Sequence, residues 1–286
     1  MTKSNYKVSE GQFKGAEGLN LFFQVWENPQ ARGTLIITHG HGEHSDSYRR
    51  VIEALKEEAW TIYAWDMRGH GRSEGLRGYA ANFDLYCEDY ALFLKQVLER
   101  PEVKAGPVVL LCHSMGALVQ LKTLILHPEF KPDAMVISSP LVGVGVHVPA
   151  YKKIAAEWLN KFLPTVTLWN EVRNDHVTRD PDVIRELERD PYRHARISAG
   201  VYLGFMNSFA LVHEKAPELK FKTLLQISDK DPVVSSEEAI RFFENLGAKE
   251  KEIKIYAGAR HEVYNDLGRE QVFQDLKNFL AGVKKS

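Results

Sequence analysis

The sequence lacks most of the features that would mark a secreted, membrane-spanning or disulfide-stapled protein. Its 286 residues include only two cysteines, Cys87 and Cys112, which favours free thiols in a reducing compartment. No apolar run reaches the roughly 20 residues that a membrane-spanning helix needs. The first residues also lack the apolar core of a signal peptide. We therefore expect a cytoplasmic protein.

Charge of one sign is equally scarce. The chain carries 37 Lys and Arg against 38 Asp and Glu, for a formal net charge of −1. With this balance and no basic run, we expect no nucleic-acid partner. Hydrophobic residues make up 44% of the chain, which is ordinary for a globular protein, and the length suits one large α/β domain.

Short apolar runs alternate with amphipathic stretches along most of the chain. The runs predict strands over 34–38, 60–65, 108–111, 134–137, 222–227 and 253–256, after a hairpin of 12–14 and 19–26, and the stretches predict helices over 48–56, 85–98, 116–126, 236–244 and 270–280. This alternation predicts an α/β fold with a mostly parallel central sheet and helices on both faces. Ligands of such sheets bind beyond the carboxyl ends of the strands.

The alternation stops between residues 141 and 219. No strand is evident there, and helical patterns cover 154–162, 182–188 and 197–212. We therefore predict a core made of residues 1–140 and 220–286, with residues 141–219 inserted in it as a helical cap.

The most informative motif is Cys112-His-Ser-Met-Gly116, at the junction of a predicted strand and a predicted helix. With almost no residues in which to turn, the chain must hold Ser114 in strained dihedrals and present its side chain. This is the pattern of a nucleophile elbow, Gly-x-Ser-x-Gly, with Cys112 in place of the first glycine. A serine that merely caps a helix is the alternative.

A nucleophilic serine needs a base, and the base needs a carboxylate to orient it. Asp231 and His261 each follow a predicted strand, so they should lie at the same sheet edge as Ser114. The chain order Ser, Asp, His is typical of this kind of sheet. We predict Ser114, Asp231 and His261 as a catalytic triad, with Asp229 as the competitor for the acidic position.

Hydrolysis also needs N–H donors aimed at the developing oxyanion. The backbone N–H of Met115 follows the nucleophile, and the backbone N–H of His41 lies in a glycine-broken loop after the strand 34–38. We predict these two groups as the oxyanion hole. The same loop offers a rival, since His39, His41 and His44 resemble the His-x-His-x-Asp-His zinc motif, with Glu43 where that motif has Asp.

Three blocks together resemble the monoacylglycerol lipase and lysophospholipase branch of the α/β-hydrolases. They are His39-Gly-His-Gly-Glu-His-Ser45, Asp66-Met-Arg-Gly-His-Gly-Arg-Ser73 and His113-Ser-Met-Gly116. The resemblance covers nearly the whole chain, although His41 stands where that branch has alanine in His-Gly-Ala-Gly-Glu-His-Ser. It implies a serine hydrolase without cofactor or catalytic metal, with a cap that shapes an acyl-chain tunnel. We interpret Asp66 and Arg68 as bracing for their loop.

The predicted cap is rich in large apolar residues. Some of them should roof the serine, and an exposed apolar cap face could dock on a lipid surface. The candidate substrate contacts are His113, Trp158, Phe205, Met206 and Phe209.

We predict a serine ester hydrolase that cleaves monoacylglycerols or lysophospholipids through an acyl-enzyme. A carboxylesterase for short acyl or aryl esters is the alternative within this class. A peptidase is disfavoured because no clear acidic site for a free amino terminus is evident, and a haloalkane dehalogenase would carry Asp at position 114. A catalytically silent binding module is the non-enzymatic alternative. Nothing in the sequence selects acyl length, head group or oligomeric state.

Overall fold

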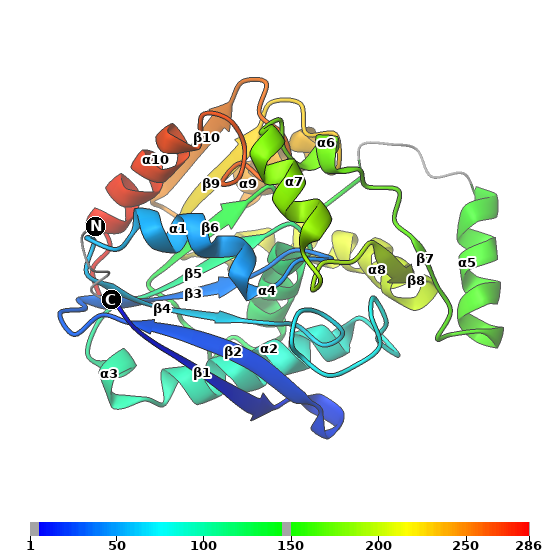
Figure 1. Ribbon diagram of the computed structural model, residues 1–286, viewed down its shortest axis with the longest axis horizontal. Coiled ribbons are helices and arrows are strands. Elements are labelled where there is room, and N and C mark those ends of the chain that lie inside the picture. Colours follow the sequence, from blue (N-terminus) through cyan, green and yellow to red (C-terminus); the bar gives the residue numbers. More distant parts are fainter. Residues whose placement is uncertain (1–5, 145–149, 286) are drawn as a thin grey trace.

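The computed structural model describes residues 6–144 and 150–285, and its centre is a twisted eight-stranded sheet (Figure 1). The strands lie in the order β1-β2-β4-β3-β5-β6-β9-β10. Their bounds are β1 Lys7–Lys14, β2 Asn20–Glu27, β3 Gly33–Thr38, β4 Trp60–Trp65, β5 Val108–His113, β6 Ala134–Ser138, β9 Lys222–Ser228 and β10 Lys251–Tyr256. Strand β2 is antiparallel to β1 and β4, and the other pairs are parallel. The predicted fold class is confirmed.

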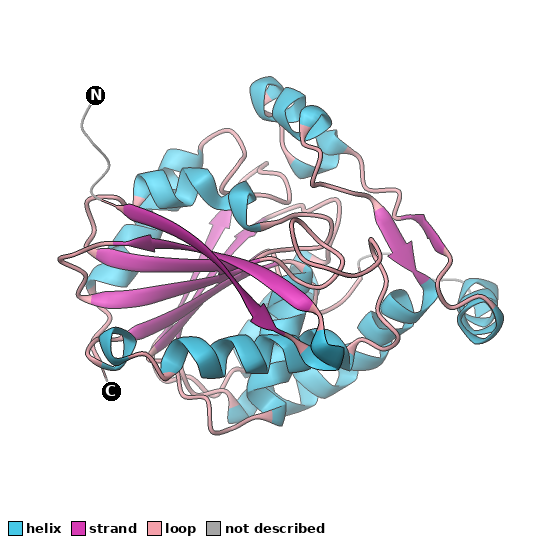
Figure 2. Ribbon diagram, turned by 60° about the horizontal axis from the view of Figure 1, so that its bottom comes forward, coloured by secondary structure: helices cyan, strands magenta, loops and turns pink. Residues whose placement is uncertain are grey.

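Helices lie on both sides of this sheet (Figure 2). Those that precede α5 or follow α8 along the chain are η1 Ala16–Gly18, η2 Ser45–Tyr48, α1 Arg49–Ala54, α2 Asp84–Leu98, α3 Pro101–Lys104, α4 Met115–Leu126, η3 Ala216–Glu218, α9 Ser236–Asn245 and α10 Arg269–Ala281. The helix predicted over 48–56 is instead a 3-10 turn followed by the shorter α1.

Alternation along the buried strands sends successive side chains to two separate cores. Leu35 and Ile37 of β3 pack with α1 and α10, whereas Ile36 between them packs with α2, α4 and α9. Both layers are dry, because nearly every side chain of β3, β4 and β5 is buried. Two covered faces leave only the strand ends open to a ligand.

The segment between β6 and β9, hereafter the insertion, lies beyond the carboxyl ends of the parallel strands (Figure 1). It holds α5 Ala150–Phe162, β7 Thr167–Trp169, α6 Asn174–Val177, α7 Pro181–Arg189, β8 Arg196–Ser198 and α8 Ala199–Lys215. Strands β7 and β8 pair antiparallel, so the expectation that this segment has no strand was wrong. Three residues per strand are too few to show the period-two pattern by which strands are recognised.

Candidate active site

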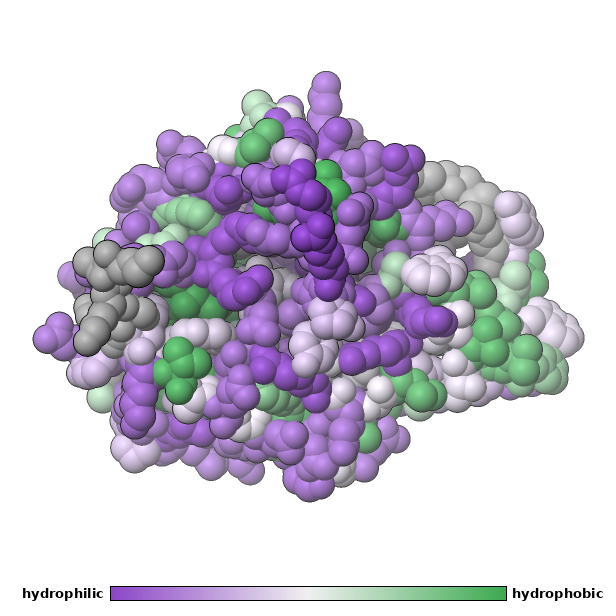
Figure 3. Space-filling view, in the orientation of Figure 1, coloured by the Kyte–Doolittle hydropathy of each residue, from purple (hydrophilic) through white to green (hydrophobic). Residues whose placement is uncertain are grey.

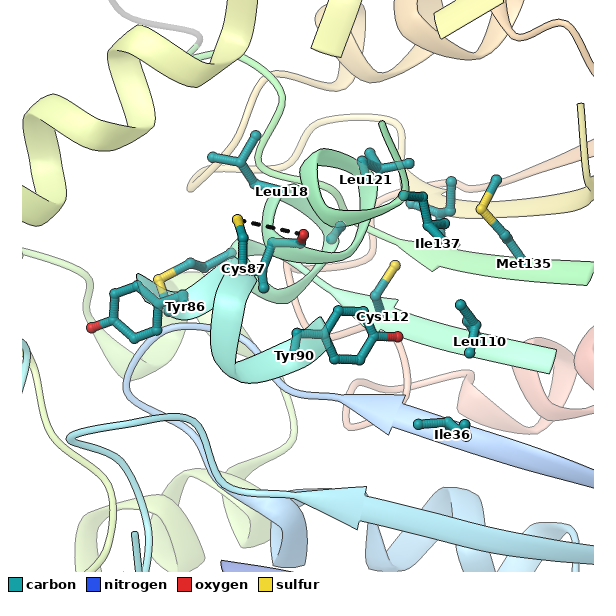
Figure 4. Close-up of a cluster of buried hydrophobic side chains, with 14 of the residues drawn as sticks. Ile36, Tyr86, Cys87, Tyr90, Leu110, Cys112, Leu118, Leu121, Met135 and Ile137 are labelled. Atoms are coloured by element: carbon teal, nitrogen blue, oxygen red, sulfur yellow. Dashed lines mark hydrogen bonds between the residues drawn. The ribbon is translucent and has the colours of Figure 1, made fainter. Parts of the chain in front are cut away.

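Ser114 sits at the sharp turn between β5 and α4 with φ 50° and ψ −119°. These dihedrals are strained for a residue with a Cβ and are typical of a nucleophile elbow. Gly116 makes the turn possible, because a Cβ there would lie 2.2 Å from the carbonyl oxygen of His39. The first motif position tolerates Cys112, whose side chain is fully buried and lies near Tyr90 and Ile137 in the core (Figure 4).

The structure brings the three predicted catalytic side chains together. His261 Nε2 lies 2.9 Å from Ser114 Oγ, and His261 Nδ1 lies 2.7 Å from Asp231 Oδ2. All three come from loops at the carboxyl ends of β5, β9 and β10, which are parallel neighbours or near neighbours in the sheet. The serine hydroxyl can therefore pass its proton to an imidazole that a carboxylate orients.

The two candidate acids of the loop after β9 have different partners. Asp231 Oδ1 accepts hydrogen bonds from the backbone N–H groups of Val233 (2.8 Å) and Val234 (3.1 Å), which fixes its carboxylate toward His261. Asp229 instead accepts from the backbone N–H of Gly258 at 2.7 Å. Asp229 thus braces the neighbouring loop, and Asp231 alone of the two contacts the imidazole.

Burial and charge act against each other in the triad. Burial alone would lower the pKa of His261, but the adjacent Asp231 carboxylate outweighs it and raises that pKa above its usual value. Burial likewise tends to raise the pKa of Asp231, but His261 and two backbone N–H donors bring it below its usual value. Asp231 therefore stays ionised, in a position from which it would stabilise a positive charge on the His261 ring.

The predicted oxyanion donors lie on the two segments that flank the serine. Met115 is the first residue of α4, and His41 belongs to the loop after β3 and lines the same cavity as Ser114. The insertion holds this loop in place, because the backbone N–H of His194 donates to Gly42 O at 3.1 Å and Asn170 Nδ2 lies 3.2 Å from His41 Nδ1.

Four imidazoles gather at the loop after β3, which supplies two of them, His39 and His41. The ring of His70 lies 5.3 Å from His39, 5.6 Å from His41 and 4.6 Å from His194 between centroids. Burial lowers the pKa of His39 and His194 to about 3 and that of His41 to about 4. The rings are therefore neutral at neutral pH.

The zinc alternative does not fit this arrangement. His44 Nε2 lies 2.8 Å from Asp190 Oδ2, and His39 Nε2 accepts from the backbone N–H of Met67 at 3.0 Å. Within the described part of the chain, no three His, Cys, Asp or Glu side chains are arranged to hold a metal ion. The nitrogens of His39, His41 and His44 thus serve the packing of the loop.

The cavity at Ser114 has a volume of about 280 Å³ and a wall of mixed character. Its polar side includes His41, Glu43, Asn170, Arg193 and Glu262, and its apolar side includes Trp169, Val172, Val177, Leu187 and Val233. Burial, reinforced by Glu262, raises the pKa of Glu43 to about 8, so that carboxyl group keeps its proton at neutral pH. Glu262 is held ionised by Arg193, whose Nη2 donates to it at 2.6 Å.

The predicted substrate contacts lie mostly away from this cavity. His113 packs its ring on His261, with centroids 4.6 Å apart. Phe205 is buried with its ring centroid 6.5 Å from that of His41, and Phe209 packs against the core. Met206 is half-buried on the same helix as these two residues. Trp158 lies on α5 and is 63% exposed.

Sequence reasoning missed Glu43, Arg193 and Glu262 as parts of the cavity wall. Glu43 lies inside the motif 39–45, and Glu262 follows His261, so adjacency to the predicted site was a usable signal. Arg193 had none, because it reaches the site only through the folding of the insertion.

The bracing of the second loop motif is as predicted. Asp66 accepts from the backbone N–H groups of Ser45 (2.6 Å) and Arg72 (2.8 Å), and Arg68 pairs with Asp89 at 2.6 Å.

The sheet order, the strained serine and the converging imidazole and carboxylate together define a serine hydrolase of the α/β-hydrolase fold. The model of the family described as "Serine aminopeptidase, S33" matches residues 29–268, and the chain belongs to that family. It is 27% identical to a monoacylglycerol lipase of Mycolicibacterium smegmatis, over 96% of this chain and 97% of that protein. It is 25% identical to phospholipase YtpA of Bacillus subtilis, over 89% and 97% respectively. The crystal structure of a Paleococcus ferrophilus monoacylglycerol lipase superposes with a TM-score of 0.79 at 26% identity, covering 96% of this chain and 98% of the other.

Proposed function

We propose that this enzyme cleaves carboxylic esters of lipid type, such as monoacylglycerols or lysophospholipids, through an acyl-enzyme. The 2.9 Å contact between His261 Nε2 and Ser114 Oγ carries the proposal. His261 takes the serine proton as Ser114 Oγ attacks the ester carbonyl, and the backbone N–H groups of His41 and Met115 hold the oxyanion. His261 then returns the proton to the leaving alcohol, and water activated by the same imidazole releases the acid.

The cavity wall favours an ester over a peptide with a free amino terminus. Such a substrate would need an uncommitted carboxylate near the serine. Among the buried or half-buried carboxyl groups of the cavity, Glu262 is paired with Arg193, Asp190 with His44, and Glu43 keeps its proton at neutral pH, whereas Glu188, unpaired among the described residues, is exposed to solvent. The names of the relatives, which include a monoacylglycerol lipase and a phospholipase, support the same preference.

A carboxylesterase acting on short acyl esters is the second candidate. The modest cavity volume of about 280 Å³ favours this alternative. A series of p-nitrophenyl esters and 1-acylglycerols from C2 to C16 separates the two, because a lipid enzyme should gain kcat/KM with acyl length.

The direct test is labelling with a fluorophosphonate probe. We expect an adduct on Ser114 and a loss of at least about 10³-fold in ester turnover for Ser114→Ala. Ser208→Ala, at a buried serine of α8 whose Oγ donates to Gly204 O at 2.7 Å, is the control and should keep its label. Absence of an adduct on Ser114 in the wild type would support the silent binding module instead.

The insertion serves as the cap in this proposal and as the face that meets lipid. Helix α5 carries an apolar ridge, defined as Tyr151, Ile154, Trp158 and Phe162, in which every side chain is more than half exposed. Figure 3 shows an apolar surface gathered at that end of the molecule. No helix in the described residues is long and apolar enough to cross a membrane, so contact through this ridge would be peripheral.

Cosedimentation with lipid vesicles tests this contact. Trp158→Ser should lower the bound fraction severalfold while leaving hydrolysis of a water-soluble ester unchanged. Val8→Ser is the control, because Val8 is 55% exposed on β1 at a distance from the insertion. Equal binding by wild type and Trp158→Ser would remove the ridge from the proposal.

A further inference from the structure

Arg193 extends from the insertion into the wall of the cavity that holds Ser114. Its side chain is 14% exposed, and its Nη2 donates to Glu262 Oε1. Its Nη1 is also buried and has no hydrogen-bond partner among the described residues. A buried charged donor without an acceptor is costly, so this atom calls for an acceptor that a ligand would supply.

The other charged groups of this cavity wall that are buried or half-buried are already committed, and Glu188 is exposed. Glu262 accepts from Arg193 and from Asn265 Nδ2 at 2.8 Å, and Asp190 contacts His44. Glu43 keeps its proton at neutral pH. Arg193 Nη1 is therefore the charged donor that remains for a substrate oxygen in this wall, beside the neutral imidazole of His41, whose Nε2 also lacks a partner among the described residues.

Arg193 also lines a second cavity, whose arginines favour an anionic oxygen of a ligand. Leu187, Asp190 and Arg193 line both the cavity at Ser114 and this second cavity of about 370 Å³. The second cavity is also lined by Arg49, Arg50 and Arg189, together with Asp46, Glu186 and Asp190. Arg50 pairs with Glu186 at 2.8 Å and Arg193 with Glu262 at 2.6 Å, which leaves Arg49 and Arg189 as the further arginines of this cavity. A group that leaves the serine past Arg193 thus enters an arginine-rich space.

We propose that Arg193 binds a phosphate on the alcohol part of the ester, which makes lysophospholipids preferred over uncharged monoacylglycerols. The proposal rests on the proposed function, because the phosphate must belong to the leaving alcohol of an ester attacked by Ser114. A guanidinium with one N–H fixed by a carboxylate and another free is suited to a phosphate oxygen, and charge assistance strengthens that bond. Arg193 is a specificity-determining residue in this scheme.

The test compares two substrates that differ only in the phosphate, 1-acylglycerol and 1-acylglycerol 3-phosphate with the same acyl chain. For the wild type we expect kcat/KM at least about tenfold higher on the phosphate ester. Arg193→Met should lower kcat/KM on the phosphate ester at least about tenfold more than on the uncharged ester, mainly through KM, so that the preference is abolished. Arg193→Lys should restore part of the preference, because it keeps the charge without the planar fork.

Controls separate recognition from folding. Arg193→Met leaves Glu262 buried without its cation, so the double variant Arg193→Met/Glu262→Gln removes both charges and should show the same loss of preference. Arg185→Met removes an arginine of α7 that is 57% exposed and outside both cavity walls, and should keep the wild-type ratio.

Equal losses on both esters, or a wild type with no preference for the phosphate, would overturn the inference and leave the proposed ester hydrolase standing. Hydrolysis of neither ester by a wild type that labels at Ser114 would overturn both. Retention of the preference in Arg193→Met would show that another group reads the phosphate.

Discussion

The sheet edge and the insertion build the same site by different means. At the sheet edge, Ser114 and Asp231 are fixed by backbone geometry and backbone N–H donors. The insertion reaches that edge through backbone bonds, such as His194 N–H to Gly42 O, and through side-chain pairs, such as Asp190 to His44 and Arg193 to Glu262. The backbone bonds fix its position, whereas the side-chain pairs can change without disturbing the triad. We therefore expect mutations at the edge to affect turnover and those in the insertion to affect substrate choice and attachment.

The largest effect should separate the two aspartates of one edge loop. Asp231→Asn should lower kcat by about 10³- to 10⁴-fold, because the amide neither stabilises the imidazolium nor selects the productive tautomer. Asp229→Asn, which changes only the contact to Gly258, should stay within about threefold. Similar kcat values for the two variants would contradict the assignment of Asp231.

The rigidity of the edge can be tested at Gly116. An alanine there would press its Cβ to 2.2 Å from His39 O and 2.6 Å from Thr38 O, neither of which can move without shifting β3. We expect Gly116→Ala to lower the free energy of unfolding by about 3 kcal/mol, the upper end of overpacking costs, as measured by urea denaturation. Gly282→Ala, where the Cβ would meet nothing closer than 3.4 Å, is the control and should change stability little.

Acid should weaken the junction between edge and insertion. The folded-state pKa values of His39, His41 and His194, about 3 to 4, lie below the ordinary value of 6.5. Their contribution to stability is complete above pH 6.5 and is lost as the pH falls toward 4, because the unfolded chain binds protons that the fold excludes. Each ring adds at most about 1.4 kcal/mol per pH unit.

Urea titrations at pH 7, 6 and 5 measure this loss. His194→Asn should make the free energy of unfolding depend less steeply on pH, because up to one proton fewer is taken up on unfolding. A stability that stays level from pH 7 to pH 5 in the wild type would be incompatible with buried neutral rings.

The smallest effect concerns the attachment of the insertion. Asp190→Asn weakens the contact to His44. Because the Asp190 side chain is 23% exposed, the loss in the free energy of unfolding should be about 1 kcal/mol or less. Limited proteolysis should nevertheless cut the insertion faster than in the wild type. Asp182→Asn, which loses only a pair within α7, is the matched control. Faster cleavage in both variants would show that the His44 contact has no special part.

The sequence predicted the sheet, the elbow and the order of the triad because each depends on local patterns. Buried strands show as apolar runs, and a serine between a strand and a helix has few ways to turn. The short β7–β8 pair escaped prediction because three residues carry no period. The polar residues of the cavity wall escaped prediction too. Large apolar residues such as Trp158 were expected near the serine, but the side chain of Trp158 lies exposed on α5.

By itself, the amino-acid sequence determined the class of fold and which residues could form a nucleophile, a base and an acid, because strand ends and turns are written in consecutive residues. Only the tertiary structure decided that Asp231 and not Asp229 contacts His261, and that Arg193 shares a cavity with Ser114. Those outcomes depend on side chains that meet across 30 positions of chain, for Asp231 and His261, and across 69, for Arg193 and Glu262, distances over which no local pattern extends.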